Sequence, residues 1–481
     1  MRPARGKFGS VLRGAAALAL SALLALPLPL LGGGPLAVGG PTSSIDGQPF
    51  VWDASQPVPY RVDGGPLALS PSGVTVIDNA AAVTQVQAMF QVWENVPTAN
   101  IRFTNAGAVQ SAGSFADGDV STALEFLDVE ASCDAGAQSP IIFDANGAII
   151  AQLIGDPAVI GFASPCSLDG TTGRIRTAEA LLNGRFRDGV NQGTNFELTA
   201  DEFEEIFVHE FGHFLGLDHS QINENVLNGT PNACSVDSLA GLPLMFPVTF
   251  CQARKTAGLT LLAPDDEAWI SWLYPESTNS PPGQVPFASG YGAIQGVIFF
   301  SDGLTHAQGV NVIARRVDDG NPANGIESVR IAFSAVSGFR FTGNPGQNVT
   351  GNNPGSLRGS RNPALLGFYE IPVTPGAYTV EVGPILHGFS AGSSVGPLST
   401  PIPSPGPNEF WDATESATDD PAATTTITVA AGQTVSNIDI ILNSTPPRFD
   451  AFESAALELP EMPPAILSRK KSLAAGCEEA V

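Results

Sequence analysis

Residues 209–219 are the most informative stretch of this chain and read His-Glu-Phe-Gly-His-Phe-Leu-Gly-Leu-Asp-His. Three of the five histidines in the 481 residues fall inside it. At about 100° per residue, His209 and His213 lie about 40° apart around a helix and one turn apart along it, so both imidazoles can bind one metal ion. Glu210 lies beside them, in a position to take a proton.

A continuing helix would turn His219 about 240° away from His213 and about 9 Å further along the axis. The helix must therefore end before it, and Gly216 allows this because glycine tolerates the left-handed conformation that closes a helix. The stretch predicts one zinc ion bound by His209, His213 and His219, with Glu210 as the general base acting on zinc-activated water. An amphipathic helix whose histidines only pack or face solvent is the alternative, and the added glycine and third histidine disfavour it.

The segments around this stretch predict an α+β domain over residues 41–275. Thr199 and Glu202 form a possible capping box, so a helix should run from there through His209. Apolar residues recur at helical spacing over 79–94. Strands are expected at residues 51–62, 100–104 and 140–143.

The sequence pattern changes after a linker at residues 276–288. Short β-rich runs separated by turn residues predict an all-β sandwich over 289–444. The expected strands lie at residues 294–300, 310–314, 377–382 and 424–442. Two stretches rich in Gly, Pro, Ser and Asn, 337–363 and 388–421, are expected to be mobile loops, and 445–481 a disordered tail.

The zinc motif resembles that of the metzincin metalloproteases, and Ser220 after the third histidine is similar to the matrixin branch. Met245, in Leu-Met-Phe-Pro at 244–247, resembles the methionine turn that lies beneath the zinc in this family. The resemblance implies a metzincin-type catalytic domain with a twisted sheet and an active-site helix, acting as an endopeptidase on proteins or peptides. It allows for calcium as well, at sites that the sequence does not locate.

The chain departs from the matrixin pattern in three ways. Its other histidines, His306 and His387, lie in the second domain, so the second, structural zinc of matrixins is expected to be missing. The connection from His219 to Met245 is longer than usual and contains Cys234. No cysteine precedes Cys133, which excludes latency through a propeptide cysteine.

The second domain resembles the carboxypeptidase-regulatory-like, or transthyretin-like, β-sandwich. The segments that carry the resemblance are 292–297, 309–312, 367–371 and 375–380. Such modules often serve as spacers or bind a surface or a substrate, and no ligand is indicated here.

Composition and the N-terminus restrict the partners and the location. A net charge of -25 offers no basic surface for phosphates, so nucleic acid is excluded as a partner. Basic residues precede an apolar run at 15–31, which predicts an export signal within residues 1–40 with an uncertain cleavage site. A membrane anchor is the alternative, but prolines interrupt the run and it is too short for a stable span. The protein is therefore expected to be secreted or extracytoplasmic.

Export permits disulfides among the five cysteines. Three pairings of Cys133, Cys166, Cys234 and Cys251 are possible, and the sequence does not choose among them. Proximity favours Cys133 with Cys166 and Cys234 with Cys251, which leaves Cys477 over.

Two other functions remain open at this point. One is a surface adhesion protein with a vestigial metal site, against which the intact Glu210 argues. The other is a zinc hydrolase that acts on non-peptide amides.

Overall fold

The computed structural model describes residues 34–111, 113–156, 158–191, 196–223, 234–247, 251–278, 280–317, 329–341, 358–383 and 409–443. The expected signal run at 15–31, most of the expected loop at 388–421, His387, Cys477 and the tail lie outside these residues.

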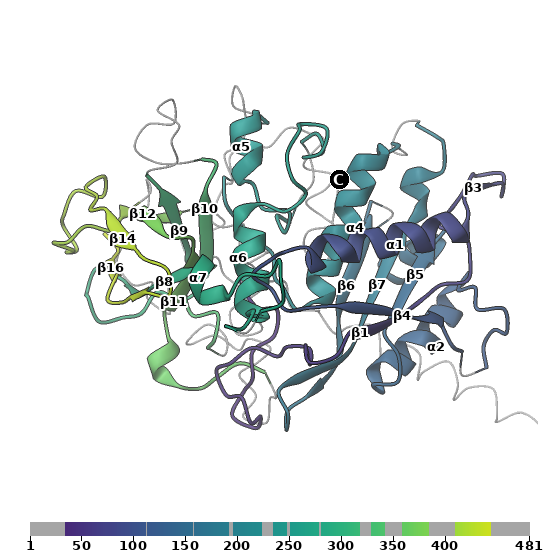
Figure 1. Cartoon of the computed structure of the whole chain (residues 1–481), viewed down its shortest axis with the longest axis horizontal. Helices are drawn as coiled ribbons and strands as arrows, with labels where there is room; N and C mark the ends of the chain where they lie inside the picture. The colour runs from purple at the N-terminus through teal and green to yellow at the C-terminus, as the bar shows by residue number, and fades with distance from the viewer. Residues whose placement is uncertain are drawn as a thin grey trace, which may run out of the picture.

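The N-terminal half is built on a five-stranded sheet of order β4-β1-β5-β7-β6 (Figure 1). Its strands are β1 (Val58–Val62), β4 (Phe103–Ala108), β5 (Pro140–Asp144), β6 (Gly161–Asp169) and β7 (Arg174–Asn183). The first four in the order pair in parallel, whereas β6 pairs antiparallel with β7 at the edge. A short ribbon of β2 (Ala68–Leu69) and β3 (Thr75–Ile77) lies apart from this sheet.

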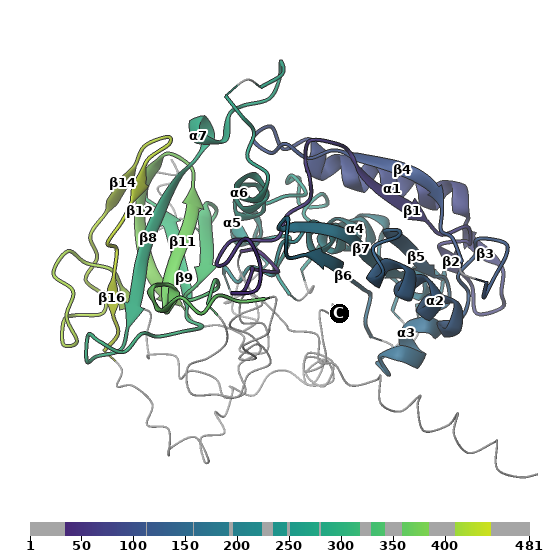
Figure 2. The ribbon, with the colours of Figure 1, turned by 90° about the horizontal axis from the view of Figure 1, so that it is seen from below.

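Helices cover both faces of the sheet because successive side chains of a strand point to opposite faces. On β5, Ile142 packs in one cluster with residues of α2 (Ala123–Asp134) and α3 (Ala148–Leu153). Its neighbour Ile141 belongs to the larger core that includes α1 (Asn79–Glu94) and α4 (Ala200–Phe214). Figure 2 shows α1 and α2 on opposite sides of the strands.

The helix α4 begins as the sequence predicts. The Thr199 side chain accepts a hydrogen bond from the Glu202 backbone N–H, and the Glu202 carboxylate accepts one from the Thr199 backbone N–H. This capping box satisfies two of the backbone donors that a helix start leaves without partners. The helix ends at Phe214, and Gly216 has a φ of 87°, the left-handed conformation expected of it.

The C-terminal half contains two further sheets. The first has the order β10-β9-β12-β13, with β14 on β12, and the second has the order β11-β8-β15, with β16 on β8. Their strands are β8 (Gly292–Phe299), β9 (Asn311–Arg316), β10 (Ala332–Val336), β11 (Phe368–Val373), β12 (Gly376–Gly383), β13 (Glu409–Phe410), β14 (Ile427–Val429), β15 (Thr434–Val435) and β16 (Ile440–Ile441). Three short helices precede them: α5 (Val236–Gly241), α6 (Pro264–Leu273) and α7 (Phe287–Gly290).

The helix α6 lies between the two halves and bonds to the C-terminal sheets (Figure 1). The indole N–H of Trp269 donates to the Ser334 carbonyl at 2.8 Å, and that of Trp272 donates to the Glu370 carboxylate at 2.7 Å. Apolar side chains of both halves form one continuous core. The boundaries at residues 275, 288 and 444 stay predictions.

Most elements that the sequence predicted are present, some with different ends, but α2, α3, β6 and β7 were not predicted. The helix at 79–94 is α1, and the strand at 140–143 is β5. The strand expected over 51–62 is confined to β1, and the one expected at 100–104 begins only at Phe103. The run at 424–442 is not one strand but three short ones, because turns such as the one at Gly432 interrupt it.

Both favoured disulfides are present in the structure. They join Cys133 to Cys166 and Cys234 to Cys251. Within the described ranges, no helix is long and apolar enough to cross a membrane.

Residues 34–40 are part of the folded structure, although the expected export signal extended up to residue 40. All seven are buried. The Leu36 backbone N–H donates to the Gly216 carbonyl at 2.7 Å, and the Asp218 backbone N–H donates to the Gly34 carbonyl at 2.9 Å. Cleavage that leaves this packing intact has to fall before Gly34.

Candidate metal centre

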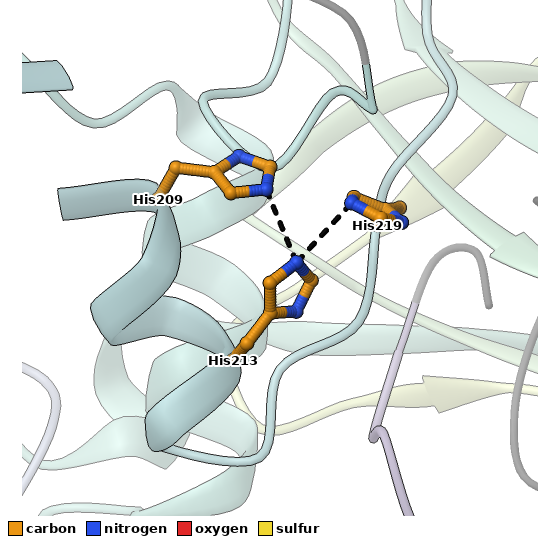
Figure 3. Close-up of side chains that lie close together, drawn as sticks. All are labelled: His209, His213 and His219. Atoms are coloured by element: carbon orange, nitrogen blue, oxygen red, sulfur yellow. Dashed lines mark hydrogen bonds between the residues drawn. The ribbon is translucent and has the colours of Figure 1, made fainter. Parts of the chain in front are cut away.

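The three histidines of the motif converge on one point. His209 and His213 come from consecutive turns of α4, and His219 comes from the irregular segment that follows the helix (Figure 3). The Nε2 atom of His213 lies 3.1 Å from the Nε2 atom of His209 and 3.1 Å from that of His219. All three residues are buried.

The other ring nitrogens fix how two of these imidazoles are protonated. The Nδ1 atom of His209 lies 2.8 Å from the Leu244 carbonyl oxygen, and that of His213 lies 2.9 Å from the Leu217 carbonyl oxygen. A carbonyl oxygen only accepts hydrogen bonds, so both Nδ1 atoms carry the proton. The facing Nε2 atoms of the neutral rings then carry lone pairs. Two nitrogen lone pairs that face each other at 3.1 Å repel each other unless a cation binds to both.

This donor set fits zinc. Nitrogen ligands at about 2.0–2.1 Å in a tetrahedron are separated by about 3.3 Å, close to the observed spacing. Burial holds the pKa of His209 well below its usual range, with a smaller contribution from His213, and lowers the pKa of His213 to about 4. Both shifts favour the neutral imidazole that binds a metal ion.

Glu210 is fully buried beside His209 on α4. Its carboxylate lies against Gly161 at the start of the edge strand β6, where a Cβ atom would come within 3.0 Å of the Glu210 Oε1 atom and 3.1 Å of the Leu181 carbonyl oxygen. The absence of a side chain at Gly161 therefore leaves the space that the carboxylate occupies. No pattern in the sequence indicated this role of Gly161, because Gly161 and Glu210 are far apart in the chain.

Met245 lies beneath the histidine helix. A Cβ atom at Gly212 would lie 2.3 Å from the Met245 Sδ atom, so only glycine lets the methionine approach the helix this closely. Leu244, the residue before it, supplies the carbonyl that orients His209. The methionine turn and the histidine ligands are thus packed as one unit.

Two buried charged residues that the sequence did not single out hold this turn. The Asp266 carboxylate accepts hydrogen bonds from the backbone N–H groups of Leu244 at 2.8 Å and Met245 at 3.0 Å. The Arg254 guanidinium donates to several carbonyls of the preceding segment, including that of Leu242 at 2.8 Å. The sequence signal for Asp266 is the run Asp265-Asp266-Glu267 at the start of α6, and an acidic run there usually indicates no more than a helix N-terminus.

A second group of potential metal ligands among the described residues consists of Cys133, Cys166 and Glu179. Its two sulfur atoms are already joined in a disulfide. The three-histidine cluster therefore remains the candidate centre.

Comparison with known proteins agrees with this geometry. No curated protein matches the chain. Residues 68–238 match the Matrixin family, and the matched part contains all three histidines and Glu210. The match supports a matrixin-like catalytic domain in this part of the chain, of a family that comprises zinc metalloproteases.

Proposed function

We propose that the protein is a secreted zinc-dependent endopeptidase in which His209, His213 and His219 bind one catalytic zinc ion and Glu210 is the general base. The observation that carries the proposal is the pair of imidazoles whose Nδ1 atoms are fixed by carbonyl oxygens, so that their Nε2 atoms face each other and the Nε2 atom of His219 lies 3.1 Å from that of His213. The Matrixin match over the same residues supports protein substrates.

Zinc, when bound, lowers the pKa of a coordinated water toward neutrality and polarises the scissile carbonyl. Glu210 takes the proton of the attacking water and later delivers it to the leaving nitrogen. Its burial beside Gly161 keeps the carboxylate in one place between the helix and the edge strand. Gly216 ends the helix so that His219 reaches the other two rings, and Met245 supports them from below.

The test compares the wild type with Glu210→Gln in zinc content and in cleavage of casein or gelatin. Loss of a general base costs about 10²–10⁴-fold in rate, while the metal should stay bound because Glu210 is not a ligand. Glu204→Gln is the matched control, because Glu204 lies on the same helix but pairs with Lys255 at 3.0 Å. A Glu210→Gln variant as active as the control contradicts the assigned role.

Zinc binding and hydrolytic activity of the wild type distinguish the two alternative functions, a hydrolase of non-peptide amides and a surface adhesion protein. Protein that binds zinc and cleaves neither protein nor peptide, but does cleave a non-peptide amide, is a different zinc hydrolase. Protein without hydrolytic activity of either kind fits a surface adhesion protein with a vestigial site. Cleavage profiling of a proteome with the wild type and Glu210→Gln would give the substrate preference.

Secretion and the type of the second domain belong to the same proposal. Two disulfides fit an extracytoplasmic protein. The two C-terminal sheets are assigned to a carboxypeptidase-regulatory-like β-sandwich on the resemblance of their sequence. N-terminal sequencing of the exported protein tests the first assignment, and is expected to find a start at or before Gly34.

A further inference from the structure

His219 is the one zinc-ligand candidate that no helix holds. The segment from Leu217 to Asn223 is fully buried but contains no helix, and its only strand-like pairing is a single bridge of Leu217 to Pro35. Its backbone forms hydrogen bonds with residues that are distant in the sequence. One example is the bond from the Ser220 N–H to the Met245 carbonyl at 2.9 Å. The position of His219 is therefore set by tertiary contacts.

The C-terminal sheet supplies several of these contacts through β9. The Asn311 side-chain amide donates to the Gln221 carbonyl at 2.7 Å, and the Arg315 guanidinium donates to the Asn223 side-chain oxygen at 2.8 Å. Between them, Ile222 packs in a separate buried cluster with Ile313 of the same strand and with Ala332.

Asn223 itself shows that the segment is held in place. Its φ of 60° lies in the left-handed region, which a residue other than glycine adopts at a cost. Its side-chain amide donates to the Ser238 carbonyl at 3.1 Å and to the Val329 carbonyl at 2.8 Å, and the Arg315 bond satisfies its oxygen. These bonds offset the unfavourable backbone conformation.

A second connection runs through Asp265 at the start of α6. Its carboxylate accepts a hydrogen bond from the Ser220 hydroxyl at 2.5 Å and another from the Ser334 backbone N–H of β10 at 2.8 Å. Ser220 directly follows His219. One buried carboxylate thus joins the neighbour of the third histidine to the C-terminal sheet.

We propose that Asn311 and Arg315 of the C-terminal sheet are positioning residues of the zinc site, which hold the segment after His219 and so fix the third ligand. The inference rests on the proposed function, because it takes the three histidines as zinc ligands. It makes the second half of the chain a working part of the catalytic centre, and not only a spacer. Glu381 directs Arg315 toward the segment through an ion pair at 2.6 Å.

The experiment uses the full chain and two alterations of the contact. Asn311→Ala removes the bond to Gln221. The double variant Arg315→Met/Glu381→Met removes the bond to Asn223 without leaving one buried charge without its partner, which keeps the cost in folding stability small. The matched control is Arg340→Met/Glu370→Met, which removes a similar ion pair at 3.0 Å that faces Trp272 of α6.

Two readouts report on the metal site without relying on turnover. Zinc affinity is measured by competition with a chelator, and the visible absorption of the cobalt(II)-loaded protein reports the geometry of the ligands. Removing partners outside the ligand shell typically weakens metal affinity about 10–100-fold. We expect about a tenfold loss and an altered cobalt spectrum in both test variants, and wild-type values in the control.

Test variants that match the wild type in zinc affinity and in the cobalt spectrum overturn the proposal. An equal loss in the control overturns it as well, because the effect would then be one of general stability. A wild type that binds zinc but cleaves no protein refutes the proposed peptidase and leaves the positioning role to be measured. A wild type that does not bind zinc refutes both.

Discussion

Removing the disulfide between Cys234 and Cys251 separates the stability of the methionine loop from the geometry of the zinc site. The two cysteines flank Met245 and are 17 residues apart in the sequence. Met245 has its own anchors in the structure, because the Asp266 carboxylate accepts its backbone N–H and that of Leu244. We therefore expect the double variant Cys234→Ala/Cys251→Ala to lose stability and to keep its zinc affinity.

The size of the effect follows from the length of the closed loop. In the chain-entropy model, a cross-link that closes a loop of 17 residues lowers the entropy of the unfolded chain by about 10 cal/mol/K, or about 3 kcal/mol at 25 °C. The other disulfide closes 33 residues and gives about 3.7 kcal/mol. Either value is a large part of the free energy of unfolding of a domain, which is usually about 5–15 kcal/mol.

Urea denaturation of the zinc-loaded protein measures the free energy of unfolding, and chelator competition measures the zinc affinity. Cys133→Ala/Cys166→Ala is the control, since it should cost at least as much stability at a distance from the zinc site. An unchanged free energy of unfolding in the Cys234 and Cys251 variant would refute the entropy argument. A loss of zinc affinity of tenfold or more would show that the disulfide, and not Asp266, sets the position of the turn.

Three further outcomes are expected. His219→Ala should lower zinc affinity and activity together by at least 10-fold, and unchanged zinc stoichiometry would place the third ligand elsewhere. Gly212→Ala should destabilise the fold by about 1–3 kcal/mol in thermal unfolding, because the new methyl group collides with Met245, and an unchanged melting temperature would contradict that packing. Burial, with a smaller effect of Asp419, raises the pKa of Glu409 to about 7. The folded state then holds this proton more tightly than the unfolded state, so the associated stability is complete below about pH 4.5 and lost as the pH rises through 7. Urea denaturation across that range should show a shallower decline for Glu409→Gln, and parallel curves would exclude a role of this group.

The local part of the site could be predicted from the motif because it depends on helix geometry alone. The capping box at Thr199 starts α4, a spacing of four residues puts His209 and His213 on one side, and Gly216 ends the helix. Each of these depends on residues a few positions apart. The structure contains this helix start, this shared side and this helix end, because each is set by local geometry.

The ends of the predicted strands were located poorly, because strand ends depend on partners that are remote in the sequence. β6 and β7 form a hairpin that no alternating pattern had indicated; β7 is largely buried, whereas most residues of β6 are half-buried. Buried strands lack the regular change between polar and apolar residues that marks a strand with one face in water. The position of this hairpin next to Glu210 could therefore not be predicted from the sequence.

The fixed position of the third histidine depends on the tertiary structure. His219 lies in a segment without regular secondary structure, so no spacing rule gives its direction. Residues 34–36, Met245, Asp265 and the C-terminal strand β9 all bond to the segment that carries it or to the turn just before it. These groups are separated by up to several hundred residues in the chain, and hydrogen bonds between them arise only when both halves have folded. The motif therefore specifies which atoms can bind a metal ion, and the packing of both halves determines that the third one is in place.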